Sequence, residues 1–349
     1  MKTPSLLLFA LTVSAMAAVP AEFSRKAAEW MQSPEAAKRD AAYRSWMQLG
    51  TDAMPDYQKA LEAARKFHNQ QIDRLCTGYR GQSNPYLKHE PLAAELDAER
   101  ERVLPLIRTD WKKEPRKIEE LREAMEELAE LNDKTRKAAR ADTKDFDARL
   151  DGHLAALAEI HRESQRFEEE PEELDDDELR ALVLEEQLEA SHFQELRERF
   201  LQTRKEITQL AEVEKANESA GRWADGSMRD FAATLNINRS LLGLLPLKLE
   251  EKLSDAAKGH SSDMARLGFF AHESPVPGKK SPWDRARVAG FQGNASGENI
   301  FMGSTSPQAA YDAWFASDGH RFIMMSEGPN VLGVGPVGSH WTMMTGNHP

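Results

Sequence analysis

The chain has 349 residues, of which 40% are hydrophobic, so it can bury a core and is long enough for more than one folding unit. Its formal net charge is −12, and the acidic excess lies in residues 1–225, because acidic and basic residues balance from Gly226 onward. These properties argue against nucleic acid as a partner, since phosphate binding needs a basic face and neither part offers one.

Residues 1–21 have the pattern of a secretory signal peptide. Lys2 precedes an apolar run from Leu6 to Met16, and Ala15-Met16-Ala17 is a small-x-small cleavage pattern. The run is too short to anchor the chain across a bilayer. We therefore expect an exported protein, extracellular or periplasmic and not an integral membrane protein. The alternative is a buried N-terminal helix.

Cys76 is the single cysteine, so it cannot form an internal disulfide bond and the fold must be held by packing. It lies in a helical pattern beside Leu75. We interpret it as a small, partly buried apolar residue. An intermolecular bridge or a reactive thiol is the alternative.

Residues 22–220 form an acidic region whose composition favours helices throughout. Prolines interrupt it, and turns are expected near residues 81–91 and 168–177. Residues 36–75 have the pattern of a helix-turn-helix pair. Apolar residues at spacings of three and four predict helices that bury one face; the clearest stripe consists of Ile118, Leu121, Met125, Leu128 and Leu131. The architecture expected is a helical bundle, with a coiled coil or self-association through these stripes as alternatives.

The composition changes near residues 218–228, which places a second domain at residues 228–349. Three helices are expected there: Leu249–Leu267, ended by Gly268, then Pro282–Ala289, and a third that Ser306 and Pro307 begin. Phe269 and Phe270 are expected in the core, and Trp283 is expected to add packing bulk. Residues 332–337 and 340–344 read as two strands joined by a Gly338-Ser339 turn.

Three polar segments in this domain are candidates for one cleft. They contain His272 in Phe270–Pro275, Glu298 in Gly297–Ile300 and His320 in Trp314–Arg321. Glu298 precedes a run of apolar residues, and an isolated carboxylate is costly to bury. We therefore expect Glu298 to have hydrogen-bonding or charged partners.

In this order, these residues closely resemble the CAP superfamily of cysteine-rich secretory proteins, antigen 5 and plant pathogenesis-related proteins, also called SCP-like domains. The resemblance covers about residues 235–346 and is to the bacterial, cysteine-free type. Its segments are Asn238-Arg239, Gly243–Leu247, Ser262–Ala265, Gly268–Pro275, Asp284–Ala286, Gly297–Ile300, Trp314, Ser317–Arg321, Gly333–Gly335 and Trp341-Thr342.

The resemblance implies an α+β fold: an α-β-α sandwich at the C-terminus, preceded here by a mostly helical, bundle or coiled-coil-like region. Family members carry a His-Glu-Glu-His tetrad in a central cleft. His272 matches the first histidine, Glu298 the first glutamate and His320 the second histidine. The second glutamate of the eukaryotic pattern falls on Ser317, which weakens any mechanism that needs two carboxylates. Adjacent Asp318 is a candidate substitute.

Two interpretations of the cleft stay open. His272, Glu298 and His320 could supply three ligands to a divalent metal such as zinc, with one open position. Alternatively, the three groups hydrogen-bond one another and hold the cleft walls together.

Two functions follow from the resemblance. The first is an exported binding module for a lipid, a glycan or an envelope or extracellular protein. The second is a metal- or histidine-assisted hydrolase that uses His272, Glu298 and His320. A Ser317 nucleophile activated by His320 is a further variant that rests on spacing alone. The missing second carboxylate favours the binding module.

Overall fold

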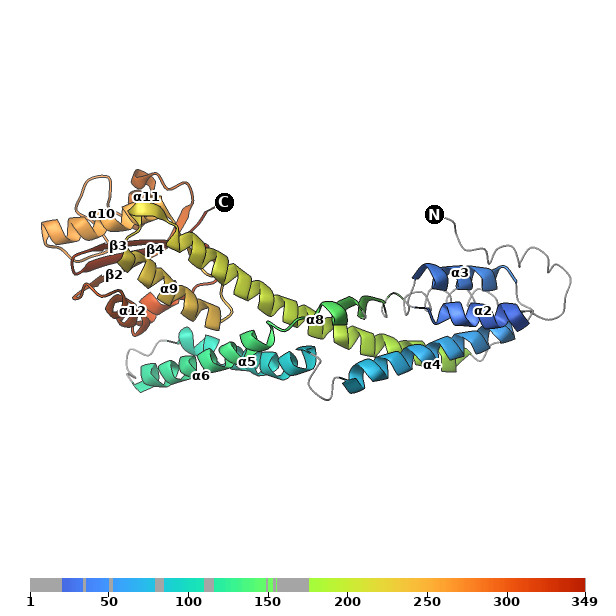
Figure 1. Ribbon diagram of the computed structural model, residues 1–349. Helices are drawn as coiled ribbons and strands as arrows, with labels where there is room; N and C mark the ends of the chain where they lie inside the picture. Colours follow the sequence, from blue (N-terminus) through green and yellow to red (C-terminus); the bar gives the residue numbers. More distant parts are fainter. Residues whose placement is uncertain are drawn as a thin grey trace. The chain divides into compact units, whose positions relative to one another are not determined.

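The computed structural model describes residues 21–33, 36–49, 53–78, 85–109, 116–148, 150–152, 155 and 176–348 (Figure 1). The predicted signal peptide lies almost wholly outside these residues. By contacts between residues the chain divides into two units, each built from two stretches of sequence. The first contains the described parts of Met1–Lys88 and Ala141–Glu198, and the second those of His89–Arg140 and Arg199–Pro349. The predicted domain limits at 22–220 and 228–349 stay a prediction.

The first unit is helical near its N-terminus. Helices α2 (Ala21–Met31), α3 (Ala36–Met47) and α4 (Met54–Gly78) share a core in which α2 packs against both of the others. The Trp46 ring contacts Phe23 edge-on at 5.0 Å between centroids and Tyr57 at 5.9 Å. The predicted helix pair of residues 36–75 is therefore present as α3 and α4. Cys76 lies within α4, as its helical pattern predicted.

Three long helices contribute to the second unit, and two of them also extend into the first. They are α5 (Pro85–Ile107), α6 (Arg116–Ala138) and α8 (Asp176–Glu218). The predicted stripe on α6 is confirmed, because Leu121, Met125, Leu128 and Leu131 are buried and Ile118 is partly buried. The turn predicted at residues 81–91 is wrong for residues 85–91. Helix α5 begins at Pro85, where the first turn lacks N–H partners in any case, and continues through Pro91 and Pro105.

The second unit contains a small four-stranded sheet. Its strands are β1 (Lys248–Leu249), β2 (Asn294–Met302), β3 (Val331–Val337) and β4 (His340–Asn347), in the order β1-β3-β4-β2. Strand β1 runs parallel to β3, whereas β3-β4 and β4-β2 are antiparallel. The predicted hairpin is confirmed as β3 and β4, with Gly338 in the left-handed region at φ 58°. The sequence reasoning missed strand β2, which carries Glu298.

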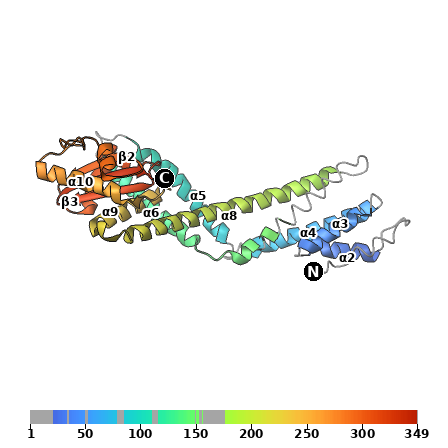
Figure 2. The ribbon, with the colours of Figure 1, turned by 90° about the horizontal axis from the view of Figure 1, so that it is seen from above.

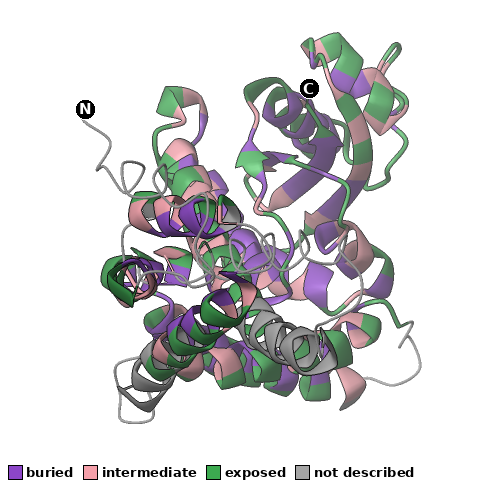
Figure 3. Cartoon of the chain, turned by 90° about the vertical axis from the view of Figure 1, so that its right-hand side faces the viewer, coloured by how far each residue is buried: buried purple, intermediate pink, exposed green. Residues whose placement is uncertain are grey.

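Helices cover both faces of this sheet, which gives the predicted α-β-α sandwich and confirms the α+β fold class. One face packs on α10 (Glu251–Leu267) and α11 (Pro282–Ala289), with Val331 and Met344 between them. The other faces α9 (Gly226–Leu241) and α12 (Pro307–Phe315), with Trp341 and Met343 in the core. The inward sides of these elements are largely buried (Figure 3).

Helix α10 lies directly against the backbone of β3. A Cβ atom at Gly335 would stand 2.0 Å from the backbone nitrogen of Lys258, which no side chain could accommodate. The α10 side chain of Ser261 also contacts the Thr342 hydroxyl at 2.8 Å between oxygens. Glycine at 335 therefore sets the close approach of helix and sheet.

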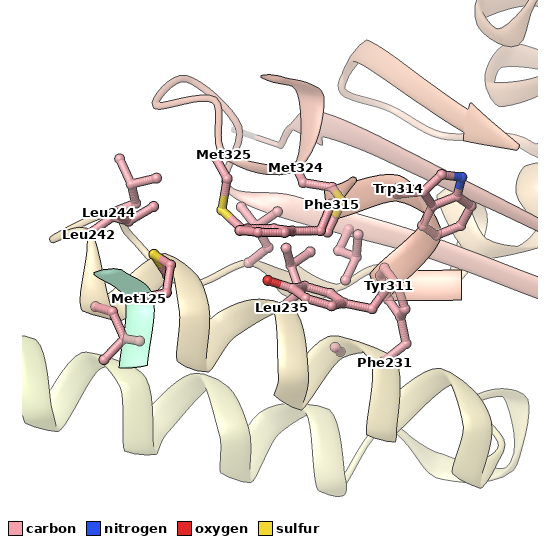
Figure 4. Packing of buried hydrophobic residues seen from close by; sticks show 14 of the residues in the cluster. Met125, Phe231, Leu235, Leu242, Leu244, Tyr311, Trp314, Phe315, Met324 and Met325 are labelled. Carbon is pink, nitrogen blue, oxygen red and sulfur yellow. The ribbon is translucent and has the colours of Figure 1, made fainter. Parts of the chain in front are cut away.

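Helices α5 and α6 belong to the same core as the sheet. Leu96 and Val103 of α5 and Met125 of α6 share a buried cluster with Phe231 of α9 and Phe315 of α12. Figure 4 shows Met125 beside Leu242 and Leu244 at the end of α9. The helical sequence before residue 218 therefore supplies part of the wall of the C-terminal core.

The end of α10 both confirms and corrects the sequence reasoning. Gly268 ends the helix in the left-handed conformation at φ 68°, as predicted, and its N–H donates to the Met264 carbonyl. Phe270 was expected in the core but is about half exposed, as is Leu267, and Phe269, also expected there, is only partly buried. The chain leaves the core immediately after the cap, so these side chains follow the loop to the surface.

Candidate functional site

His272 lies in the loop between α10 and α11. His260, a fully buried residue of α10, contacts this loop. Its Nε2 lies 3.0 Å from the Ala271 carbonyl oxygen. Because a carbonyl only accepts, Nε2 carries the hydrogen. Burial lowers the pKa of His260 below its ordinary value, which keeps the ring neutral. His260 therefore positions the residue that immediately precedes His272.

Arg285 ties the same loop to the sheet. Its guanidinium is buried and donates to the carbonyls of His272, Lys279 and Lys280, each at 3.1 Å, and to the Glu298 carboxylate. The residue stands in the first full turn of α11. A capping box between Ser281 and Asp284 fixes the start of that helix, and so the direction of Arg285.

Glu298 lies on β2 opposite Met344, and its side chain is 2% exposed. One carboxylate oxygen accepts from His272 Nδ1 at 2.9 Å, and the other accepts from Arg285 Nη2. Both oxygens thus have the partners that burial of this group requires. The expectation that Glu298 is a paired, buried carboxylate is therefore confirmed.

His320 has a different partner. It lies on α13 (Asp318–Met324), and its Nδ1 stands 2.8 Å from the Ser317 hydroxyl oxygen. Burial and the nearby His272 lower the pKa of His320. Asn299, next to Glu298 on β2, donates to the His320 carbonyl at 3.0 Å. Of the three predicted site residues, His272 and Glu298 hydrogen-bond to each other. His320 lies near His272 but hydrogen-bonds to Ser317 instead.

Asp318 does not replace the missing glutamate. It pairs at 2.7 Å with Arg321, and both side chains are buried. Arg321 also donates to the carbonyls of Ile107, the last residue of α5, and of Thr109. Asp318 and Arg321 thus form a structural junction between α13 and the end of α5.

Beside His272 and Glu298 is a cavity of about 370 Å³. Helix α13 reaches it because residue 297 is glycine: a Cβ there would stand 2.7 Å from Ile323 Cγ2. Strand β2 skips one residue in its pairing at Ser296, a bulge at the cavity rim. The cavity is lined by His272, Glu273, Ser281, Pro282, Trp283, Ala295, Ser296, Gly297, Glu298 and Ile323.

The predicted metal ligands of this cleft are each engaged in a hydrogen bond within the protein. Glu298 is engaged through both oxygens, one of them by a guanidinium, and His320 bonds to Ser317. Among the residues that the structure describes, no group of three or more His, Cys, Asp or Glu side chains is arranged to hold a metal ion. The geometry corresponds instead to the second interpretation for His272 and Glu298, which hydrogen-bond each other.

Sequence reasoning missed several residues that shape the site. Arg285 and His260 hold the His272 loop, and Asn299 connects β2 to α13. Trp283 was expected to add packing bulk but is 59% exposed at the cavity. The capping box at Ser281 was a usable signal for Arg285, since it fixes the register of α11. No sequence signal identified His260, which reads as an ordinary helix residue.

Comparison with a known protein family agrees with the sandwich fold of the C-terminal part. Residues 232–340 match the model of the cysteine-rich secretory protein family, CAP. The uncharacterized protein YkwD of Bacillus subtilis is 38% identical over 109 residues, 31% of this chain and 42% of that protein. The uncharacterized membrane protein YlbC of the same organism is 31% identical over 107 residues, 31% of this chain and 30% of that protein. The chain thus spans less than half the length of these relatives.

Among solved structures, an extracellular SCP-domain protein from Bacillus anthracis is 34% identical with a TM-score of 0.33, covering 35% of this chain and 41% of that chain. An outer surface protein of Borrelia burgdorferi is 16% identical with a TM-score of 0.32, and the match covers 35% of this chain and 93% of that chain. Within the described residues, no helix combines the length and apolar character needed to cross a membrane. The match of residues 232–340, together with the sandwich and the His272–Glu298 cleft, identifies the C-terminal part of this chain as a CAP domain.

Proposed function

We propose that the CAP domain of this chain is a binding module of an exported protein, and that it takes its ligand in the cavity beside His272 and Glu298. The observation that carries this proposal is the state of Glu298. Both of its oxygens are engaged, by His272 and by Arg285, so Glu298 holds the loop of His272 and helix α11 to the sheet. The position of a second carboxylate is Ser317, whose hydroxyl bonds to His320.

The polar groups of the cleft suit recognition. His272 is half exposed, while its Nδ1 is held by Glu298, so the ring is oriented and its other nitrogen faces no protein partner that the structure describes. Fixed donors and acceptors beside an apolar wall orient a ligand without loss of side-chain freedom on binding. The ligand classes that this proposal covers are lipids, glycans and envelope or extracellular proteins.

The test is calorimetric titration of the full mature chain with representatives of each class, followed by mass spectrometry of the recovered ligand. We expect binding by one class, with the ligand returned intact. His272→Ala should weaken that binding by about tenfold or more, because it removes an oriented polar contact. His192→Ala, an exposed histidine of α8, is the matched control and should bind normally. Binding that is equally strong in His272→Ala would contradict the proposed site.

The same samples test the alternative function, a hydrolase, and the expectation that the protein is exported. A metal- or histidine-assisted hydrolase through His272, Glu298 and His320 stays a prediction, and cleaved ligand that appears with added zinc would replace the binding module by that enzyme. The intact mass of protein recovered outside the cytoplasm should show that a signal peptide within residues 1–21 has been removed. Full-length protein that stays in the cytoplasm would contradict the export.

A further inference from the structure

Trp283 presents a fixed aromatic surface to the cavity. It stands in the first turn of α11, and 59% of the residue is exposed, although indole rings of this size are usually buried. Its Nε1–H donates to the Ala295 carbonyl of β2 at 2.9 Å. The bond satisfies the polar atom of the ring and holds its plane between helix and strand. An apolar face is therefore kept exposed in one orientation at the rim of a cavity.

The rest of the cavity wall is mixed in character. Pro282, Ala295 and Ile323 continue the apolar side. The polar side includes His272, whose Nδ1 is occupied by Glu298, so that Nε2 is the ring nitrogen left for a ligand. Ser296 shares a hydrogen bond of 3.1 Å with the Thr345 hydroxyl, and a hydroxyl has capacity for further bonds.

The charges of the cavity are compensated within the protein. Glu298 is paired with buried Arg285, and Glu273 has Lys280 at 3.7 Å. A ligand in this cavity therefore meets no unpaired fixed charge among its lining residues. This favours an uncharged ligand that has both an apolar surface and hydroxyl groups.

We propose that the cavity binds a pyranose ring of a glycan, with the apolar face of the sugar on the Trp283 indole and its hydroxyls toward His272 and Ser296. This inference rests on the proposed binding function and names its ligand class. A sugar ring matches the site because it is flat and apolar on one face and carries hydroxyls around its rim. The volume of about 370 Å³ lies in the ordinary range for small-ligand sites.

A lipid chain fits the same wall less well. It would cover the polar atoms of His272 and Ser296 without bonding to them, and each buried polar atom left unpaired weakens binding. The indole would still contribute apolar contact to a lipid. The orientation of the ring by a hydrogen bond, beside fixed polar groups, favours the sugar.

The test is calorimetric titration of the full chain with three soluble tetrasaccharides: the β-1,4-linked N-acetylglucosamine tetramer, cellotetraose and maltotetraose. We expect at least one to bind, and Trp283→Ala to weaken that binding at least tenfold. Trp283→Phe keeps an aromatic ring but loses the Nε1–H bond, so its affinity should lie between those of the parent chain and of Trp283→Ala. Val288→Ala is the control, since Val288 is an equally exposed apolar residue of α11 that does not line the cavity. Circular dichroism checks that each variant is folded.

A second arm separates this inference from the function on which it rests. The parent chain, these variants and His272→Ala are titrated with phosphatidylglycerol vesicles and with palmitate. Lipid binding that depends on His272, without binding of any tetrasaccharide, overturns the glycan inference and keeps the binding module. Glycan binding that is unchanged in Trp283→Ala also overturns it. Failure of every tetrasaccharide and lipid, and of the envelope and extracellular proteins of the first test, to bind overturns both proposals.

Discussion

At the scale of single residues, Arg285 is the most connected side chain of the site. It is buried and joins three loop carbonyls to the Glu298 carboxylate, so the position of His272 depends on it. A buried ion pair often contributes no more to the stability of the fold than well-packed apolar side chains in its place. Removal of one partner is costly, however, because the other charge is left buried alone.

We therefore predict that Arg285→Met destabilises the chain by about 3–5 kcal/mol, the cost of an uncompensated buried charge. Urea unfolding followed by circular dichroism measures the change. Arg285→Met combined with Glu298→Gln should recover part of the loss, because no charge is then left without a partner. Arg287→Met is the control, since Arg287 makes an exposed pair with Asp284 on the same helix. If Arg285→Met lost as little stability as Arg287→Met, the structural role assigned to Arg285 would be contradicted.

At the scale of elements, a buried histidine lies at the contact of α5 with α8. His89 is fully buried, its Nε2 stands 3.0 Å from the Thr203 hydroxyl oxygen, and its ring packs edge-on against Phe200. The pKa of His89 is lowered to about 4, mainly by burial and also by the nearby Arg199, whereas Asp97 opposes the shift. Nδ1 is buried without a hydrogen-bond partner among the described residues, so protonation would add an unpaired charge.

The direction of the pH effect follows from that pKa. Above pH 6.5 the ring is neutral in the folded and unfolded chain, and its full contribution to stability is present. As the pH falls toward 4, the unfolded chain takes up a proton that the folded chain does not, so stability is lost. We predict a loss of about 2 kcal/mol between pH 7.5 and pH 5 from this residue.

Urea unfolding at the two pH values measures this loss, and His89→Leu should show less of it. His192→Ala, which replaces an exposed histidine of α8, is the comparison variant. His260 and His320 contribute in the same direction, because burial lowers their pKa values too. An equal pH dependence in His89→Leu and the parent chain would contradict the role of His89.

At the scale of the whole molecule, the second unit is larger than the CAP domain. Asn217 at the end of α8 accepts from the Leu249 N–H at 2.7 Å and donates to the Leu247 carbonyl at 3.3 Å, so it holds β1. Arg100 of α5 donates to the Leu241 carbonyl at 2.9 Å. These contacts add to the apolar cluster that α5 and α6 share with α9 and α12.

We predict that residues 226–349 alone are much less stable than residues 85–349. Without α5, α6 and α8 the shared apolar cluster is exposed, and Arg321 loses two carbonyl partners. The shorter chain should bind a hydrophobic dye and unfold at lower urea. Arg108→Ala in the longer chain removes an exposed pair with Glu327 and should change stability by less than about 1 kcal/mol. Equal unfolding midpoints for both chains would contradict the prediction.

Much of the C-terminal fold could be predicted because its signals are local. Gly268 and Gly290 end helices, Ser306 and Pro307 begin one, and Gly338 makes the hairpin turn. These conformations depend on a few adjacent residues. Strand β2 was missed because Asn294–Met302 is not a clean alternation of polar and apolar residues, and it becomes a strand by pairing with β4.

The sequence by itself determined the CAP pattern, the helices with clear caps, and the need of Glu298 for partners. The tertiary structure alone decided which partners those are. Arg285 and His272 stand 13 and 26 positions from Glu298, and a hydrogen bond over such separations depends on how helices and strands pack. It likewise decided that Trp283 faces the cavity and that α5 and α6 complete the core. Local signals specify where elements begin and end, whereas shared burial determines which side chains meet.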